Sequence, residues 1–424
     1  MASIAIKGGT LVDATGERRA DVVIDGATIT AVGDDLGGDV VLDASGCLVS
    51  PGLVDLNARL GQPGNEEAET IESASRAAAL GGFTAVVAMP DTDPVIDGAA
   101  GVRDVRDLAR SALCDIEIAG TVTVGGAGER LSPMAEMAEL GVRLFTDAGH
   151  GVQDDRLMRR ALEYASGLGV TIAQHCDNDA LSQGGQMHEG IMSSDLGIPG
   201  IPAEAEELMV VRDITLSRLT GGRVHFQHLS TAGSLGMVRA ARASGLPITA
   251  EVAPHHLVLT DETVSTYDPR FKTSPPLRTA NDVAALRQAL GDGVIDAIVS
   301  DHTPHEPHLK ELPFDQAPSG GAGLETALAV ALTELDLPVA QILAALSWGP
   351  AAIAGVGDTH GGPIDAGRAA NLTVIDPTAE WTVDPAAMAS STRATPWAGR
   401  TLRGRVRHTI VHGEPVVVDA EARR

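Results

Sequence analysis

The chain has 424 residues, of which 44% are hydrophobic and 2% aromatic, so a large core has to be filled mainly by Ala, Val, Leu and Ile. Its formal net charge of −26 argues against nucleic acid as a partner, because phosphate binding requires a basic surface. No apolar run approaches the roughly 18 residues of a membrane span, and the N-terminus lacks a basic-then-apolar signal pattern. The three cysteines are scattered, so we expect a reduced, cytoplasmic protein without a membrane partner.

Residues 1–50 contain short apolar runs separated by turn residues such as Gly8-Gly9 and Asp25-Gly26, a pattern typical of β-strands. The runs lie at 4–6, 10–12, 21–24 and 28–32. Residues 365–424 show the same pattern, with runs at 371–376, 406–411 and 414–418. We therefore predict that 1–50 and 365–424 pair as the two parts of one small β-sandwich.

Residues 51–364 alternate short apolar runs with helical stretches, which is typical of parallel βα units. Eight runs are predicted strands: 52–56, 84–89, 116–120, 141–145, 170–173, 223–226, 247–250 and 297–300. Helical stretches such as 157–168 and 282–290 lie between them. This order predicts a (β/α)₈ TIM-like barrel, whose chemistry lies at the carboxyl ends of the strands.

Metal-competent side chains follow three of the predicted strands. His175, His228 and Asp301 each stand at a strand end, and imidazole nitrogens and carboxylate oxygens are ordinary zinc ligands. The plainer interpretation is that the histidines are buried core residues or remnants of an ancestral site. Asp301, likewise, is either a general base or a buried carboxyl group.

Six further motifs accompany these strand ends, at 89–94, 158–164, 196–200, 249–257, 275–278 and 323–326. Together they resemble the dihydroorotases of the amidohydrolase superfamily over nearly the whole chain. The resemblance implies two metals held by a His-x-His pair on the first strand, a bridging carboxylate on the fourth, one histidine each on the fifth and sixth, and an aspartate on the eighth. His175, His228 and Asp301 match the last three of these ligands, and in an active enzyme Asp301 would be catalytic by moving the proton.

The other ligand positions are replaced. Asn57 and Arg59 stand where the paired histidines are expected, and Ala148 stands at the bridging position. Asn57 offers one weak amide oxygen, whereas Arg59 is always protonated and has no lone pair. We therefore expect at most one Zn²⁺ per chain, held by the three retained ligands, or none. In the absence of a metal, Arg59 is expected to pair with Asp301.

The substrate positions that the resemblance implies have changed as well. Gly61 replaces an arginine that clamps the substrate carboxylate, a bidentate contact that glycine cannot make. Asp91 and Ser274 replace two asparagines that contact substrate, and His305 is retained. An acidic substrate such as dihydroorotate is therefore disfavoured.

Three functions follow as hypotheses. The first is a non-catalytic dihydroorotase-like protein of pyrimidine biosynthesis, for which the resemblance implies aspartate carbamoyltransferase as a partner and a homo-oligomer, a dimer, as the assembly. The second is a cyclic-amide hydrolase with a single zinc. The third is a residual dihydroorotase that interconverts N-carbamoyl-aspartate and dihydroorotate. The sequence favours the first hypothesis, because metal and substrate positions have changed together.

Overall fold

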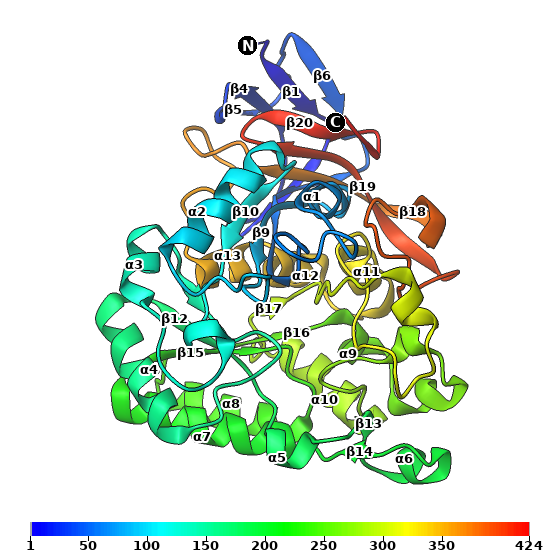
Figure 1. Ribbon diagram of the computed structural model, residues 1–424. Coiled ribbons are helices and arrows are strands. Elements are labelled where there is room, and N and C mark those ends of the chain that lie inside the picture. Colours follow the sequence, from blue (N-terminus) through cyan, green and yellow to red (C-terminus); the bar gives the residue numbers. More distant parts are fainter. Residues whose placement is uncertain (1, 424) are drawn as a thin grey trace.

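The computed structural model describes residues 2–423. Strands from the two ends of the chain form a β-sandwich at one end of the molecule (Figure 1). One sheet has the order β5 (Thr28–Gly33), β4 (Asp21–Asp25), β1 (Ile4–Lys7) and β6 (Val40–Asp43). The other has the order β21 (Glu421–Ala422), β20 (Glu414–Val418), β19 (Thr401–Val411), β18 (Leu372–Thr382), β7 (Leu48–Pro51), β2 (Thr10–Asp13) and β3 (Gly16–Arg19).

The N- and C-terminal segments share the larger of these sheets. β18 runs antiparallel to β7, with Leu372 opposite Pro51, and β7 pairs in turn with β2. Apolar side chains from both segments fill the space between the sheets, among them Leu11, Ile24 and Ile410. The predicted pairing of the two ends therefore describes the contacts seen, while the residue boundaries at 50 and 364 stay predictions.

The middle of the chain is a (β/α)₈ barrel, as the sequence predicts. Its strands are β8 (Leu53–Ala58), β9 (Phe83–Ala88), β10 (Asp115–Ile118), β11 (Leu144–Phe145), β12 (Thr171–His175), β15 (Arg223–Gln227), β16 (Ile248–Val252) and β17 (Ala297–Ile298). Neighbouring strands pair in parallel, and the parallel bridges Gly120↔Phe145 and Ala58↔His302 close the ring. All eight carboxyl ends therefore meet at one face.

Helices surround the barrel (Figure 1). They are α1 (Ile71–Leu80), α2 (Ala99–Leu108), α3 (Met134–Glu139), α4 (Asp155–Leu168), α5 (Asp179–Ser182), α6 (Ile191–Leu196), α7 (Glu204–Thr220), α8 (Ala232–Ala243), α9 (Pro254–Val258), α10 (Ala280–Gly291), α11 (Ala327–Glu334), α12 (Val339–Leu346) and α13 (Trp348–Ala354). A two-stranded pair, β13 (Met187–His188) and β14 (Gly200–Ile201), lies outside the barrel sheet. Within residues 2–423 there is no helix with the length and apolarity to cross a membrane.

Helix α4 shows how local sequence sets these boundaries. The Asp154 side chain accepts a hydrogen bond from the Leu157 amide and caps the first turn, and Gly169 ends the helix in the left-handed conformation at φ 70°. Met158, Leu162 and Ala165 repeat at helical spacing on one face and are buried. The amphipathic pattern thus fixes which side of α4 packs against the barrel.

Some strands were not expected from the sequence, and others are longer than the apolar runs that predict them. β3 was not expected, because Gly16–Arg19 is a polar, largely exposed edge strand without alternation. β18 continues to Thr382, beyond the apolar run at 371–376, because bulges let it stay paired with the long strand β19. Non-local pairing, rather than local pattern, defines both elements.

Candidate functional site

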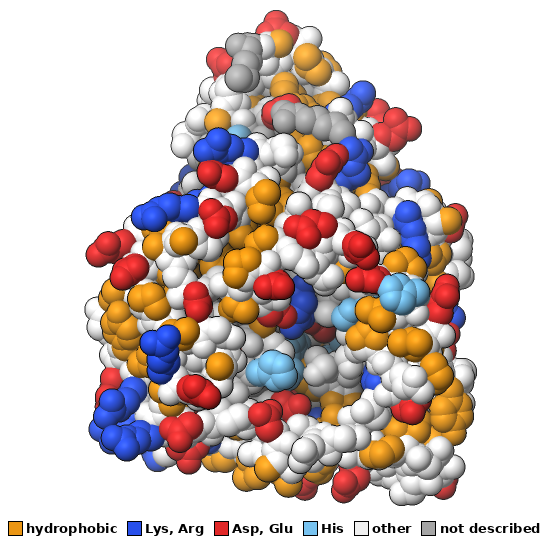
Figure 2. Space-filling view, viewed as in Figure 1, with side chains coloured by type: hydrophobic (Ala, Val, Ile, Leu, Met, Phe, Trp, Pro, Cys, Tyr) orange, Lys and Arg blue, Asp and Glu red, His pale blue; other side chains and the backbone are white. Residues whose placement is uncertain are grey.

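The carboxyl ends of the barrel strands open into a cavity of about 310 Å³, visible as a hollow on the face in Figure 2. Seven side chains singled out from the sequence line it together: Arg59, Asp91, His175, His228, Ser274, Asp301 and His305. Met89, Thr92, Thr303 and Ser319 complete much of the wall. Asn57 and Ala148 are buried beside the cavity rather than in its described lining.

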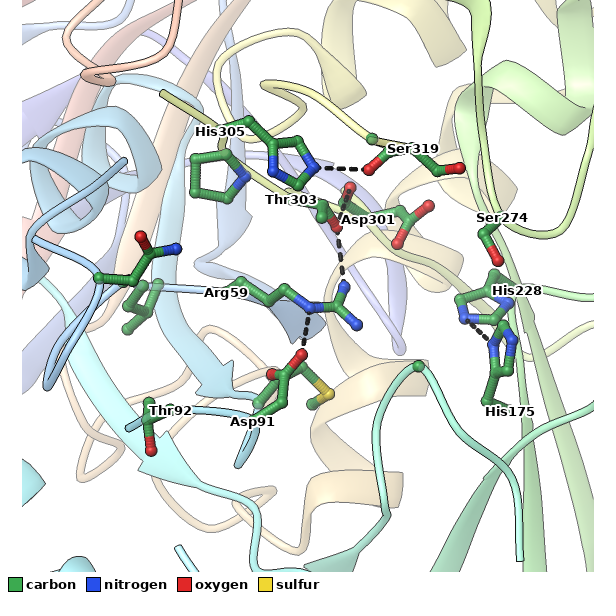
Figure 3. Close-up of a pocket in the computed structure, with 17 residues that line it drawn as sticks. Arg59, Asp91, Thr92, His175, His228, Ser274, Asp301, Thr303, His305 and Ser319 are labelled. Carbon is green, nitrogen blue, oxygen red and sulfur yellow. Dashed lines mark hydrogen bonds and ion pairs between the residues drawn. The ribbon is translucent and has the colours of Figure 1, made fainter. Parts of the chain in front are cut away.

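Arg59 reaches into this cavity from the end of β8 (Figure 3). Its Nε forms an ion pair with Asp91 Oδ2 at 2.6 Å, and its Nη1 donates to Thr303 Oγ1 at 2.8 Å. Burial acts to lower the pKa of the guanidinium, but the charge and hydrogen bond of Asp91 raise it overall. Arg59 is therefore a fixed positive charge in the cavity wall.

The expected pairing of Arg59 with Asp301 is wrong: the ion pair that Arg59 forms is with Asp91. Burial raises the pKa of Asp301 to about 8, although the charge of Arg59 acts in the opposite direction. Asp301 is therefore mostly protonated at neutral pH. The Asp91 side chain is 36% exposed and the Asp301 side chain only 7%, so an ion pair with Asp91 costs the guanidinium less desolvation.

His175 and His228 lie side by side because their strands, β12 and β15, pair in parallel. His175 Nδ1 is 3.2 Å from His228 Nε2, and the rings meet edge to face with centroids 4.9 Å apart. Burial, with help from Arg59, lowers the pKa of His175 to about 3, and burial also lowers the pKa of His228 far below its usual range. Both imidazoles are therefore neutral and able to offer a lone pair.

The histidine pair has the spacing of two ligands of one metal ion, but the site lacks the other ligands of a two-metal centre. With zinc–nitrogen bonds of about 2.0–2.1 Å, two nitrogens on one tetrahedral ion are about 3.3 Å apart, close to the histidine spacing. The outward nitrogens, His175 Nε2 and His228 Nδ1, have no hydrogen-bond partner among residues 2–423. Over the same residues, however, no group of three or more His, Cys, Asp or Glu is arranged to hold a metal ion. The residues present do not fit a two-metal centre, and Asp301 as a third ligand stays a prediction.

Three strand ends at the site adopt left-handed backbone conformations. Ala148 has φ 55°, His228 has φ 31° and Asp301 has φ 48°. Such non-glycine conformations cost about 1–3 kcal/mol each and cluster at functional sites. Ala148 has no polar group to offset that cost, whereas Asn or Asp tolerates this region better. The backbone conformation at position 148 is therefore one that Asn or Asp would adopt at less cost than Ala148 does.

Glu251 is a site residue that the sequence reasoning missed. It is fully buried on β16 and accepts hydrogen bonds from Asn57 Nδ2 at 3.3 Å and His225 Nε2 at 2.8 Å. The backbone amide of His228 also donates to it, at 3.3 Å. The side-chain amide of Asn57 is therefore engaged in a hydrogen bond to the neighbouring Glu251 carboxylate. A charged residue inside the apolar run Ile248–Val252 was the signal that could have pointed to it.

A loop held by buried lysines closes another side of the cavity. His305 Nε2 lies 2.6 Å from the Ser319 carbonyl oxygen, and burial lowers the pKa of His305 to about 4. Lys272 Nζ donates at 2.8 and 2.7 Å to two carbonyls within residues 314–320. Lys310 Nζ donates at 2.8 Å to two more. The lysines thereby fix the loop that carries Ser319 against the cavity.

Solved structures with the same architecture include the L-hydantoinase (dihydropyrimidinase) from Arthrobacter aurescens, with a TM-score of 0.89 at 22% identity over 100% of this chain and 97% of that one. The dihydropyrimidinase from Brevibacillus agri gives a TM-score of 0.86 at 24% identity over 99% of this chain and 96% of that one. At such identities the likeness shows the fold alone, a (β/α)₈ barrel joined to a β-sandwich.

Comparison of the amino-acid sequence with known proteins identifies the family to which the chain belongs. A family profile described as Dihydro-orotase-like matches residues 46–234. A curated dihydroorotase from Pelotomaculum thermopropionicum is 45% identical over 424 residues, covering 98% of this chain and 99% of its own. One from Streptomyces coelicolor is 46% identical over 410 residues, covering 95% of this chain and 96% of its own. The chain belongs to the dihydroorotase family.

Proposed function

We propose that this protein is a dihydroorotase-family member of pyrimidine biosynthesis that lacks the two-metal chemistry and acts through its fold and surface. The observation that carries this proposal is the guanidinium of Arg59 in the cavity, held by Asp91 and Thr303. A positive charge there repels a divalent cation, an effect that the charge of Asp91 and the partial exposure of both side chains reduce but do not reverse at the Arg59 position, where no lone pair is offered. It stands at a position where the family resemblance calls for a ligand.

The neighbouring positions support the same proposal. The Asn57 amide is engaged by Glu251, and the Ala148 methyl group offers no ligand. In the metal-free protein, burial raises the pKa of Asp301 to about 8, so the carboxyl group carries its proton in most molecules at pH 7. The chain keeps the barrel and loses the groups that would make a nucleophile from water.

The partner in this proposal is aspartate carbamoyltransferase, as the family resemblance implies, and the scattered cysteines favour a cytoplasmic complex. A gently purified complex, captured at low salt through a tagged copy of this chain, is the direct test. Copurification of a carbamoyltransferase supports the partnership. Its absence at every salt concentration counts against it, without bearing on the loss of metal chemistry.

The loss of metal chemistry is tested by elemental analysis of protein purified without chelators, together with a dihydroorotate turnover assay. The curated dihydroorotase from Streptomyces coelicolor serves as the positive control. We expect less than two bound metals per chain and no turnover above the Asp301→Asn background. Two metals per chain with turnover sensitive to Asp301→Asn would overturn the proposal.

A second candidate function rests on the histidine pair. The 3.2 Å separation of His175 Nδ1 and His228 Nε2 suits two ligands of one zinc ion. About one zinc per chain, lost in His175→Ala, and hydrolysis of a neutral cyclic amide such as a hydantoin or dihydropyrimidine would favour this candidate. Neutral substrates are the ones to screen. Gly61 cannot bind a substrate carboxylate, and the acidic Asp91 would repel one and already pairs with Arg59.

A further inference from the structure

Another cavity, of about 480 Å³, lies between helix α11 and the strands β18 and β19, which Figure 1 labels on the right of the molecule. Its volume is within the range of small-molecule pockets in proteins. The buried side chains Leu328, Met388 and Val406 form an apolar part of its wall. It shares no lining residue with the cavity at the strand ends, which contains Arg59. The two cavities are therefore separate sites.

Acidic side chains outnumber basic ones around this second cavity. Glu325, Glu380 and Asp384 line it, and Arg405 is the one cationic side chain in its described lining. Glu380, Asp384 and Arg405 are exposed at the rim, whereas Glu325 is partly buried. The net charge of −26 on the whole chain adds a further negative potential. The cavity therefore attracts cations and repels anions.

Glu325 has one carboxylate oxygen engaged and the other free. Its Oε1 accepts hydrogen bonds from the backbone amides of Ala389 at 2.9 Å and Ser390 at 3.3 Å. Its Oε2 has no hydrogen-bond or ion-pair partner within residues 2–423. Burial, together with the charge of Glu69, raises the pKa of Glu325 to about 7. A partly buried carboxylate without a counter-ion is unfavourable, and a bound cation offsets that cost.

Trp381 adds an aromatic surface to the same cavity. Its indole Nε1 donates to the Gly404 carbonyl oxygen at 3.1 Å, so the polar edge of the ring is already engaged. The rest of the ring is carbon, and the face of an indole attracts organic cations. A metal ion is disfavoured, because residues 2–423 contain no group of three or more His, Cys, Asp or Glu arranged to hold one. An indole beside a free carboxylate oxygen is suited instead to an ammonium group.

We propose that this cavity binds a small organic ammonium cation with an apolar body. The ammonium group lies between the Glu325 carboxylate and the Trp381 ring, and Glu380 and Asp384 strengthen the attraction from the rim. The apolar body packs against the wall that contains Met388. This inference is independent of whether the cavity at the strand ends is catalytic.

The segment 389–391, which Glu325 binds on one side, is bound on its other side by Glu69. Ser390 Oγ donates to Glu69 Oε2, and the Ser391 amide donates to Glu69 Oε1 at 3.0 Å. Glu69 Oε2 in turn lies 3.3 Å from His302 Nε2, just beyond the eighth barrel strand. A cation bound at Glu325 therefore acts on a segment that is joined to the barrel. Amide hydrogen exchange of this segment reports whether the cavity is occupied.

The test is isothermal titration calorimetry of the full chain with benzylammonium near neutral pH, with uncharged benzyl alcohol and potassium ion as comparison ligands. We expect benzylammonium to bind about tenfold more tightly than benzyl alcohol, because only the former carries a charge for Glu325. Glu325→Gln keeps an acceptor for the Ala389 and Ser390 amides and should weaken benzylammonium binding about tenfold. Trp381→Leu should weaken it about threefold.

The matched control is Glu163→Gln, which removes an exposed carboxylate on α4 and should leave the affinity unchanged. Circular dichroism checks that each variant is folded. Saturation with benzylammonium should slow amide exchange within residues 385–391 of the wild type, and should not do so in Glu325→Gln. This readout places the ligand in the chain independently of the affinities.

No binding of benzylammonium at millimolar concentrations would overturn the proposal, as would unchanged affinity in a folded Glu325→Gln variant. Equal affinities for benzylammonium and benzyl alcohol would show that the charge is not recognised. Equal competition by potassium would reduce the effect to ionic strength and contradict the proposal. If Asp91→Asn abolishes binding and Glu325→Gln does not, the cation occupies the cavity at the strand ends and the proposed site is wrong.

Discussion

Arg59 and Asp91 form a 2.6 Å ion pair across the ends of two neighbouring barrel strands, β8 and β9. The pair places a permanent cation in a cavity that the family resemblance associates with divalent metals. The guanidinium is held in place by a carboxylate and a hydroxyl group, so it is part of the fold of the site rather than a mobile surface charge. Several measurable consequences follow from this relationship and from the groups around it.

Restoring the missing ligands should restore metal binding. In the triple variant Asn57→His/Arg59→His/Ala148→Asp, we expect bound zinc to rise by about one ion per chain over the wild type, because a cation is removed and donors are added. Aspartate suits the φ of 55° at position 148 better than alanine does. Elemental analysis measures the change, with Arg59→Ala as the control that removes the cation without adding a ligand. Unchanged zinc in a folded triple variant would contradict the prediction.

Breaking the ion pair should destabilise the protein modestly. Asp91→Ala leaves Arg59 without its carboxylate, and because both side chains are partly exposed we expect a loss of about 1 kcal/mol in the free energy of unfolding. Urea denaturation measures this value. The control is Asp107→Ala, which breaks the more exposed pair between Arg110 and Asp107 and should cost less than about 0.5 kcal/mol. Equal effects of the two substitutions would show that the cavity pair is no stronger than a surface pair.

Asp301 should make stability depend on pH in the metal-free protein. Burial raises its pKa to about 8 in the folded state, while the unfolded value is near 3.8. Between those values the native state binds more protons than the unfolded state, so this group lowers stability as pH rises from about 4 to 8. Asp301→Asn, which cannot ionise, should flatten the pH dependence in that window. The free energy of unfolding of chelator-treated wild type and Asp301→Asn is measured by urea denaturation between pH 4 and 8. Identical slopes of this free energy against pH for the two proteins would refute the prediction.

The lysine-held loop should loosen when a lysine loses its charge. Lys310→Met removes the donor to the Pro318 and Gly320 carbonyls, so amide hydrogen exchange within residues 314–320 should become faster. Lys7→Met is the control, since Lys7 lies in the β-sandwich and its ion pair with Asp21 is long, at 3.7 Å, and partly exposed. Mass spectrometry of peptides covering the loop reads out the difference. No change in exchange would mean that other contacts hold the loop.

Most of the fold was readable from local sequence. The eight runs predicted as barrel strands all overlap strands of the structure, because parallel strands that are covered on both faces are rich in apolar residues, whatever their partners. The strand β3 of the β-sandwich has no such apolar pattern, and it is stabilised by its pairing with the neighbouring strand β2. That strand needed the tertiary structure because pairing, not local propensity, stabilises it.

The sequence by itself also determined which side chains gather at the site. His175, His228 and Asp301 follow barrel strands, and barrel geometry brings strand ends together, so their convergence followed from position alone. Only the tertiary structure decided the partners: Arg59 binds Asp91 instead of Asp301, and Asn57 binds Glu251. The physical reason is that pairing depends on distance and on the relative burial of competing carboxylates, and neither quantity is encoded in local sequence.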